Sequence, residues 1–191
     1  MNTSQDHLPS QEQKISLNAS ENTFLSRPKD REYVEITVEK GIARIGTRKG
    51  GDSSDITLGF ACKTEACNFK YPDDLKIKIE AVTNISCTIK YTKQPDYSCR
   101  DSIMDWILEL HIIRHETSTE NRIMKLFQLL ITKLGKRTSE GYLLEHNLPH
   151  ARIAEIIGST RSTVSRTIST LRKTKKIYID ELKNQLLLPA E

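Results

Sequence analysis

Two arginines and two serines lie close together near the C-terminus, in the segment Arg161-Ser-Thr-Val-Ser-Arg166, with Ser162 and Ser165 between the arginines. A guanidinium group can donate two hydrogen bonds to guanine O6 and N7 in the major groove, and a serine hydroxyl can bond to bases or phosphates. On a short helix, these residue types favour sequence readout of DNA. A solvated helix face is the alternative, and a lone pair of arginines would favour it.

Two helices joined by a tight turn are predicted to hold these side chains. The first helix has one apolar face: Ile153, Ala154, Ile156 and Ile157. Gly158 then supplies a residue that can adopt a positive φ at the turn. In the second helix, one stripe recurs at i, i+4 and i+7 and is predicted to pack inward: Val164, Ile168 and Leu171.

This segment resembles the helix-turn-helix of the cyclic-AMP-receptor/fumarate-nitrate-reductase (Crp/Fnr) family, with the pattern L-T-x-x-x-I-A-x-x-[IV]-G-x-[ST]-R-x-T-V-[SG]-R-x-[IL]-x-x-L. The run from Gly158 to Arg166 is similar to that of the global nitrogen regulators of photosynthetic bacteria. Pro149 departs from the pattern, because it stands where the family has a Ser or Thr N-cap whose hydroxyl touches a phosphate. The matching residues are Leu148, Ile153, Ala154, Ile157, Gly158, Thr160, Arg161, Thr163, Val164, Ser165, Arg166, Ile168 and Leu171.

The resemblance implies an α+β protein with a β-roll sensor domain, a dimerisation helix and a C-terminal winged helix-turn-helix domain. Residues 1–27 are polar and lack apolar periodicity, so we expect a flexible N-terminal arm. Residues 28–100 contain short β-type runs separated by turn residues, which predict a small antiparallel barrel or roll. The phosphate-binding cassette of the cyclic-nucleotide subgroup is absent from these runs. We therefore expect a degenerate sensor that does not bind cyclic nucleotide, and the sequence leaves open whether it binds any effector.

Residues 101–116 are predicted to form the dimerisation helix. An apolar seam with spacings of 3, 4 and 3 fits the core positions of a coiled coil. A helix packed on the β-strands of its own chain would satisfy the same spacing. The residues of the seam are Ile103, Trp106, Leu110 and Ile113.

Residues 117–191 are predicted to form the DNA-binding domain. Ser118 or Thr117 can cap an amphipathic helix over residues 121–134, and Gly135 is expected to end it. Two apolar runs flank a polar turn at residues 181–184, which predicts a terminal hairpin, the wing. The expected DNA contacts, to bases or phosphates, are Arg161, Ser162, Ser165, Arg166, His150, Thr160, Lys173 and Lys176.

The distribution of charge agrees with this division. The whole chain has a net charge of +4, but the part from Thr117 onwards holds 13 Lys/Arg and 7 Asp/Glu, a net charge of +6. The basic residues are therefore concentrated in the part that carries the helix-turn-helix, as neutralisation of phosphates requires.

Metal and catalytic sites are not expected. The cysteines, at Cys62, Cys67, Cys87 and Cys99, match neither a zinc spacing nor the cluster ligands of one branch of the family. His111 and His115 stand at i and i+4, which could hold a metal, but both lie off the apolar seam and we interpret them as part of a solvated helix face. No catalytic triad or phosphate-binding loop is visible, so we expect no cofactor and no enzymatic activity.

Together these patterns predict a homodimeric transcription regulator that binds a near-palindromic site in double-stranded DNA. RNA polymerase is a further partner that the resemblance implies, although no motif marks activation. No signal peptide or membrane-spanning run is visible, which predicts a cytoplasmic protein without a membrane partner. A protein-interaction adaptor that keeps the fold without specific DNA readout is the alternative, and a redox or metal sensor acting through the cysteines is a weaker one.

Overall fold

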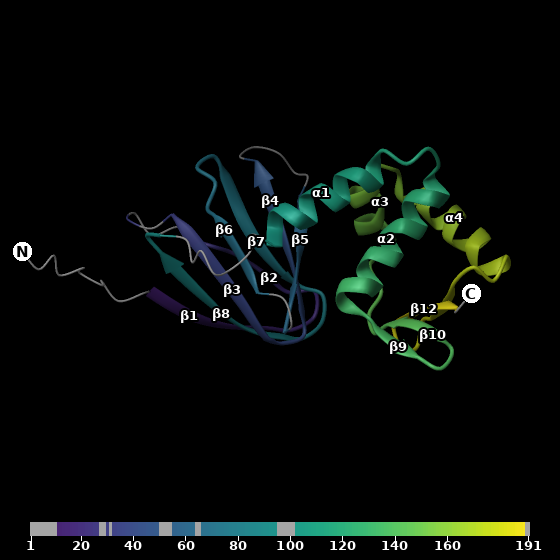
Figure 1. Ribbon diagram of the computed structural model, residues 1–191, viewed down its shortest axis with the longest axis horizontal. Coiled ribbons are helices and arrows are strands. Elements are labelled where there is room, and N and C mark those ends of the chain that lie inside the picture. Colours follow the sequence, from purple (N-terminus) through teal and green to yellow (C-terminus); the bar gives the residue numbers. More distant parts are fainter. Residues whose placement is uncertain are drawn as a thin grey trace, which may run out of the picture.

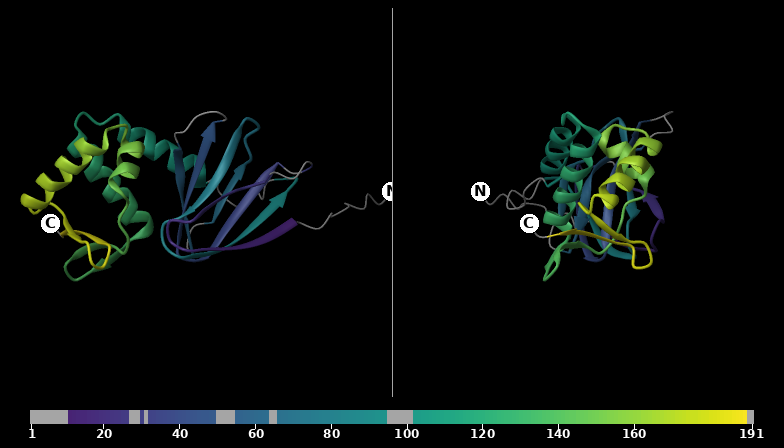
Figure 2. Two further views of the ribbon diagram at one scale, coloured as in Figure 1. Left: turned by 180° about the vertical axis from the view of Figure 1, so that it is seen from behind. Right: turned by 90° about the vertical axis from the view of Figure 1, so that its right-hand side faces the viewer.

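The computed structural model describes residues 11–26, 30, 32–49, 55–63, 66–94 and 102–189. β-strands form layers at one end of the molecule and helices form the other end, with helix α1 (Ser102–Arg114) leading from one to the other (Figure 1). The view from behind shows the same two parts (Figure 2, left). The expected α+β architecture is confirmed.

The N-terminal part is a sandwich of two four-stranded antiparallel sheets, in the orders β1-β8-β3-β6 and β2-β7-β4-β5. Apolar residues alternate along these strands and fill the space between the sheets, as in β8, where every second residue is buried. The strands are β1 (Gln11–Leu17), β2 (Asn22–Phe24), β3 (Tyr33–Lys40), β4 (Ile42–Lys49), β5 (Ile56–Cys62), β6 (Cys67–Lys70), β7 (Leu75–Ala81) and β8 (Ile85–Thr92).

The interpretation of residues 1–27 as a flexible arm is wrong for residues 11–24. β1 pairs with β8 from Gln11 opposite Tyr91 to Leu17 opposite Ile85, and β2 pairs with β7. The polar composition hid β1 because it is an edge strand, in which only Ile15 and Leu17 lie against the core of the sandwich. Leu25, in the rest of the expected arm, is also buried, whereas residues 1–10 and 27 lie outside the described residues.

Helix α1 packs on the sandwich through Trp106, which has no exposed surface. The Trp106 ring contacts the Phe60 ring of β5, with centroids 5.3 Å apart. Gly59 makes this approach possible, because a Cβ atom there would lie 2.7–2.9 Å from three atoms of Trp106. The glycine in β5 therefore sets how closely α1 can lie on the sheet.

The C-terminal part combines three helices with a four-stranded sheet of order β11-β12-β10-β9. The terminal hairpin, β11 with β12, forms as the sequence predicts, whereas the β9–β10 hairpin was not anticipated. The elements are α2 (Thr119–Leu134), β9 (Lys136–Thr138), β10 (Gly141–Leu144), α3 (His150–Ile157), α4 (Arg161–Lys173), β11 (Tyr178–Asp180) and β12 (Gln185–Pro189).

The ends of α2 follow local chemistry. Ser118, one of the two expected N-caps, accepts a hydrogen bond from the Asn121 amide. Gly135 ends the helix with a φ of −93°, so a left-handed conformation is not what requires glycine. The reason is space, because a Cβ atom would lie 2.7 Å from the Ile131 oxygen and 2.8 Å from the Leu143 oxygen.

His146 provides a test of this fold. Its side chain is buried, neither ring nitrogen has a hydrogen-bond partner among the described residues, and burial lowers its pKa from 6.5 to about 4. The unfolded chain therefore binds a proton at a higher pH than the native state does. We expect the free energy of unfolding to fall as the pH drops from about 6.5 to about 4, by about 3 kcal/mol in total.

Urea titrations of the wild-type protein and a His146→Leu variant, at a series of pH values, will measure this effect. The free energy of unfolding of the wild type should fall relative to that of the variant as the pH is lowered, because the leucine takes up no proton. Parallel pH profiles would contradict the assignment of a neutral, buried imidazole.

Candidate nucleic-acid interface

Helices α3 and α4 form the predicted helix-turn-helix. Gly158 ends α3 with φ 66° and ψ 51°, the left-handed conformation that glycine adopts without strain. Thr160 then caps α4, because its hydroxyl accepts a hydrogen bond from the Thr163 amide. The Thr160 hydroxyl, which we expected at DNA, is therefore already used inside the turn.

The buried face of α4 agrees with the sequence prediction. The expected stripe is at most 3% exposed and belongs to the same core as α2 and α3. It consists of Val164, Ile168 and Leu171. This packing fixes the rotation of α4, and so determines which side chains point to solvent.

The opposite face of α4 presents the two predicted base-reading arginines. Arg161, Ser162 and Arg166 are exposed, and Ser165 is half-buried. Within the described part of the chain, no hydrogen bond or ion pair engages either guanidinium group. Both are therefore available to a ligand, in contrast to Arg172, which pairs with Glu181 of the wing turn at 2.8 Å.

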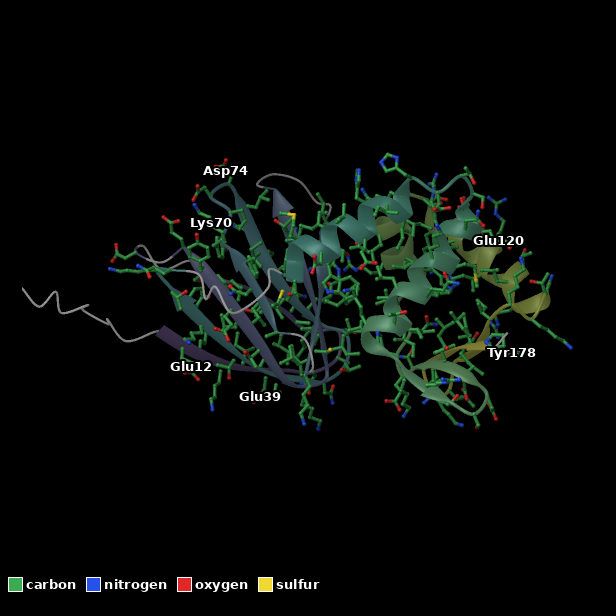
Figure 3. All side chains as sticks on the ribbon, in the orientation of Figure 1. Glu12, Glu39, Lys70, Asp74, Glu120 and Tyr178 are labelled. Carbon is green, nitrogen blue, oxygen red and sulfur yellow. The ribbon has the colours of Figure 1, made fainter. Side chains whose placement is uncertain are left out.

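The basic residues after α4 differ in their surroundings. Lys173, at the last position of α4, is exposed. Lys176 Nζ instead lies 2.6 Å from Glu120 Oε1 in the first turn of α2. Glu120 lies at the end of the molecule that also carries Tyr178 of the wing (Figure 3). This ion pair is exposed and hence weak, so a phosphate can compete with Glu120 for Lys176.

Pro149 and His150 begin α3. Pro149 occupies the N-cap position and forms no side-chain cap, as its departure from the family pattern predicts. His150 is half-buried and lines a hollow between the sandwich and the C-terminal part, together with Ser20 and Val82. His150, which we expected to contact a phosphate, is thus partly enclosed by the sandwich.

The predicted dimerisation seam lies on the inward face of α1, and this assignment is corrected. Ile103 packs into the core of the sandwich, and the other three residues join the core shared with α2, α3 and α4. The alternative, packing on the chain's own strands, describes Ile103 and Trp106, whereas Leu110 and Ile113 pack in the core of the helices. The four residues are Ile103, Trp106, Leu110 and Ile113, all at most 6% exposed.

A second stripe of α1 points to solvent. Its spacings of 4, 3 and 4 also fit the core positions of a coiled coil. Met104 and Leu108 are 60% and 57% exposed, and Ile107 and Ile112 flank them at 37% and 52%. We call Met104, Leu108 and His111 of α1, together with His115, which directly follows the helix, the outer stripe.

A buried ionic cluster joins the two parts of the molecule, and sequence analysis did not anticipate it. Arg44 of β4 is fully buried and donates to Thr57 Oγ1 at 2.7 Å, to Glu80 Oε2 at 2.9 Å and to Glu155 Oε2 of α3 at 3.3 Å. Glu155 also accepts hydrogen bonds from the Thr57 amide and hydroxyl, at 2.8 and 2.7 Å. Arg152 completes the Arg44 cluster by pairing with Glu80 at 2.8 Å.

Charge balance keeps this cluster intact. Burial lowers the pKa of Arg44 and the neighbouring Arg152 lowers it further, while Glu155 and Glu80 oppose both effects. A guanidinium nevertheless stays protonated in proteins. The positive charge of Arg44 is thus compensated by carboxylates from both parts of the molecule.

Two further arginines brace the end of α3. Arg114 of α1 donates to the Ile156 and Glu155 carbonyls, at 2.7 and 2.6 Å. Arg122 of α2 donates to the Ile157 carbonyl at 3.4 Å. These bonds satisfy carbonyls that a helix C-terminus leaves without intrahelical partners.

The cysteines do not assemble into a metal site in the described part of the chain. Cys67 and Cys87 are buried and Cys62 is half-buried, and no group of three potential ligands is found among the described residues. Cys99 lies outside them. No helix among these residues is long and apolar enough to cross a membrane.

Known proteins share this arrangement. Residues 105–188 match the model of a Crp-like helix-turn-helix domain. A global nitrogen regulator from Nostoc is 36% identical over 63 residues, which cover 33% of this chain and 28% of that protein. A global nitrogen regulator from Synechococcus elongatus is 33% identical over 70 residues, covering 37% and 32%. The matched segment is about a third of the length of these relatives.

Solved structures extend the similarity of fold to most of the chain. A CRP-family transcriptional regulator from Thermus thermophilus has a TM-score of 0.67 at 18% identity, covering 92% of each chain. FixK2 from Bradyrhizobium japonicum has a TM-score of 0.68 at 15% identity, covering 95% of this chain and 93% of that one. At this level of identity the similarity establishes a common fold.

The Arg44 cluster can be tested by paired substitutions in one strand. Arg44→Ala leaves carboxylates without their buried partner, so we expect the free energy of unfolding to fall by about 3 kcal/mol or more. Arg48, in the same strand as Arg44, is 40% exposed and pairs with Asp55, which keeps Lys78 as a second partner. Arg48→Ala should therefore cost at most about 1 kcal/mol. Urea unfolding followed by Trp106 fluorescence measures both values. Equal losses for the two variants would refute a special role for Arg44.

Proposed function

We propose that the chain is a member of the Crp/Fnr family and a homodimeric transcription regulator that binds specific DNA sequences; its Crp-like helix-turn-helix domain and its fold support this. The observation that carries the proposal is the solvent-facing side of α4, where Arg161 and Arg166 have no protein partner among the described residues. A short helix with free guanidinium groups suits the major groove. Ser162 and Ser165 adjust the readout beside them.

Phosphate contacts orient α4 on the duplex. Lys173 is exposed beside the C-terminal end of α4, and Lys176 reaches the DNA by exchanging Glu120 for a phosphate. His150 offers a further contact at the start of α3, where its neighbour Pro149 has no hydroxyl to contribute. Such contacts fix position and orientation and carry no sequence information.

A second copy pairs with this one through the outer stripe of α1. Met104 and Leu108 supply apolar area that the chain's own strands leave uncovered. The core positions of a parallel coiled coil are occupied by such apolar residues. A helix of 13 residues is marginal as an isolated coiled coil, so the dimer gains further stability when both halves bind one DNA molecule. Two recognition helices then enter successive major grooves, about 34–36 Å apart, at a near-palindromic site.

The sandwich acts here as a scaffold and does not bind cyclic nucleotide. Its interior is filled by apolar side chains of both sheets, among them Ile36, Ile45 and Ile89, all fully buried. Any small-molecule effector therefore binds outside this core. RNA polymerase is the further partner that a regulator of this kind requires for activation.

Selection of bound sites from random DNA, followed by titrations with variants, tests the DNA-reading role. On the selected site Arg166→Ala should cost about 1–3 kcal/mol and relax discrimination at one base pair. Lys176→Ala should weaken binding to all sequences alike and reduce the salt slope by about one. An equal loss on every sequence for Arg166→Ala would refute base reading by this residue.

The adaptor alternative gives a different result in the same experiment. A DNA reader with several phosphate contacts loses orders of magnitude in affinity between about 50 and 200 mM salt and still prefers one sequence. A protein-interaction adaptor would show neither tight binding nor a preference. The observation that favours this alternative is Pro149 at the N-cap of α3, because proline has no hydroxyl that could contact a phosphate.

The dimer is tested by a charge in the outer stripe. Leu108→Glu places a carboxylate from each copy at the seam, so we expect the dimer dissociation constant to rise by about 100-fold or more. Gln128→Glu adds the same charge to an exposed position of α2 and should leave the constant unchanged. Sedimentation velocity over a concentration series measures both. A dimer that tolerates Leu108→Glu would have to be held by another surface.

A further inference from the structure

We propose that His111 and His115 form half of a binding site for a divalent transition metal of the zinc class, and that the same two residues of a second copy complete it. The proposal rests on the dimer of the proposed function. It uses none of the side chains assigned to DNA, so the two can fail separately.

The two imidazoles already converge on one point. His111 Nε2 and His115 Nε2 lie 3.2 Å apart, and the rings meet edge to face with centroids separated by 4.6 Å. Two nitrogens bound to one tetrahedral zinc ion at 2.0–2.1 Å lie about 3.3 Å from each other. The observed separation therefore needs almost no adjustment to bind a metal.

The contact between the two rings also suits a metal. In a hydrogen bond between two Nε2 atoms at 3.2 Å, one nitrogen donates and the other accepts. The accepting nitrogen uses the same lone pair that ligates a metal. A cation placed between the rings would take the place of this hydrogen bond.

The neighbouring guanidinium group is engaged elsewhere. Arg114 is the nearest guanidinium along the helix, but its hydrogen bonds to the Ile156 and Glu155 carbonyls hold it against α3. The imidazoles lie at the C-terminal end of α1, where the helix dipole favours positive charge. Both histidines are exposed, so an ion can reach them from solvent.

One chain supplies too few ligands for a stable site. The described residues contain no group of three potential metal ligands, so a single α1 offers two nitrogens and leaves the remaining positions to water. His111 and His115 are the last two positions of the outer stripe. In a parallel helix pair each such position meets its own copy across the axis, which brings four imidazoles together. Tetrahedral zinc takes four ligands of this kind.

The consequence is regulatory. The last turn of α1 leads directly into α2, the first helix of the C-terminal part, which begins at Thr119. A metal that ties the two copies together here strengthens the dimer next to its DNA-binding domains. Metal availability would therefore set the dimer population, and through it the affinity for a two-half site.

The test uses the full chain without a polyhistidine tag, stripped with a chelator and titrated with Zn²⁺ or Co²⁺. We expect one metal ion per two chains and a dimer dissociation constant lowered about tenfold or more by Zn²⁺. Co²⁺ should show a tetrahedral ligand-field spectrum without the charge-transfer band of a thiolate ligand, which separates this site from the cysteines.

Variants locate the site. His115→Gln should weaken metal binding by about 100-fold, because each dimer loses two of four ligands. Glu109 is exposed on another side of α1, so the Glu109→Gln variant should bind the metal as tightly as the wild type does. Leu108→Glu, which separates the copies and keeps both histidines, should lower the metal affinity to that of an isolated pair.

The contrary results are equally specific. One ion per chain, full affinity in the Leu108→Glu monomer, a thiolate spectrum, or no binding at all would each overturn the proposal. A protein that stays monomeric with and without Zn²⁺ would overturn it together with the dimer. Specific DNA binding that persists while metal binding fails would leave the proposed function standing alone.

Discussion

The fold depends on one buried charge. Arg44 lies in the middle of β4, without exposed surface, and its guanidinium is satisfied only when Glu155 of α3 reaches across from the C-terminal part. If that part moved away, Arg44 and Glu155 would each lose a partner, and burial makes such losses expensive. The buried Arg44–Glu155 ion pair therefore holds the helix-turn-helix against the sandwich, in addition to apolar packing. As a result, α4 has a defined direction relative to the β-strands.

Helix α1 explains why the parts can be joined so closely and still leave an interface. It buries Trp106 on Gly59 of the sandwich and contributes Leu110 and Ile113 to the core of the helices, yet Met104 and Leu108 on the other side remain in water. A helix that is apolar on two sides has two surfaces to cover, and this chain covers one of them. The proposed dimer and the proposed metal site both follow from the second side.

Local sequence patterns predicted much of this arrangement, because they depend on nearby residues. The turn at Gly158, the buried stripe of α4 and the terminal hairpin all follow from spacing and turn chemistry. The buried face of α1 could not be predicted in this way. Two stripes of α1 satisfy the same heptad rule, and only packing against β5 decides which of them is buried. Strand β1 and the Arg44 cluster were also beyond prediction: their partners stand far away in the sequence, as Glu155 does from Arg44, 111 residues on. The roles of the α4 arginines and of the other site residues stay predictions.

The arginine braces on α3 connect these features. Arg114 of α1 and Arg122 of α2 hold the carbonyl end of α3, and the turn to α4 follows immediately. Because α1 and α2 are bonded to the end of α3, a rotation of α1 about its own axis would strain these hydrogen bonds next to the turn that leads to α4. In the proposed dimer, the way in which the two α1 helices pack would then affect the orientation in which each α4 approaches DNA.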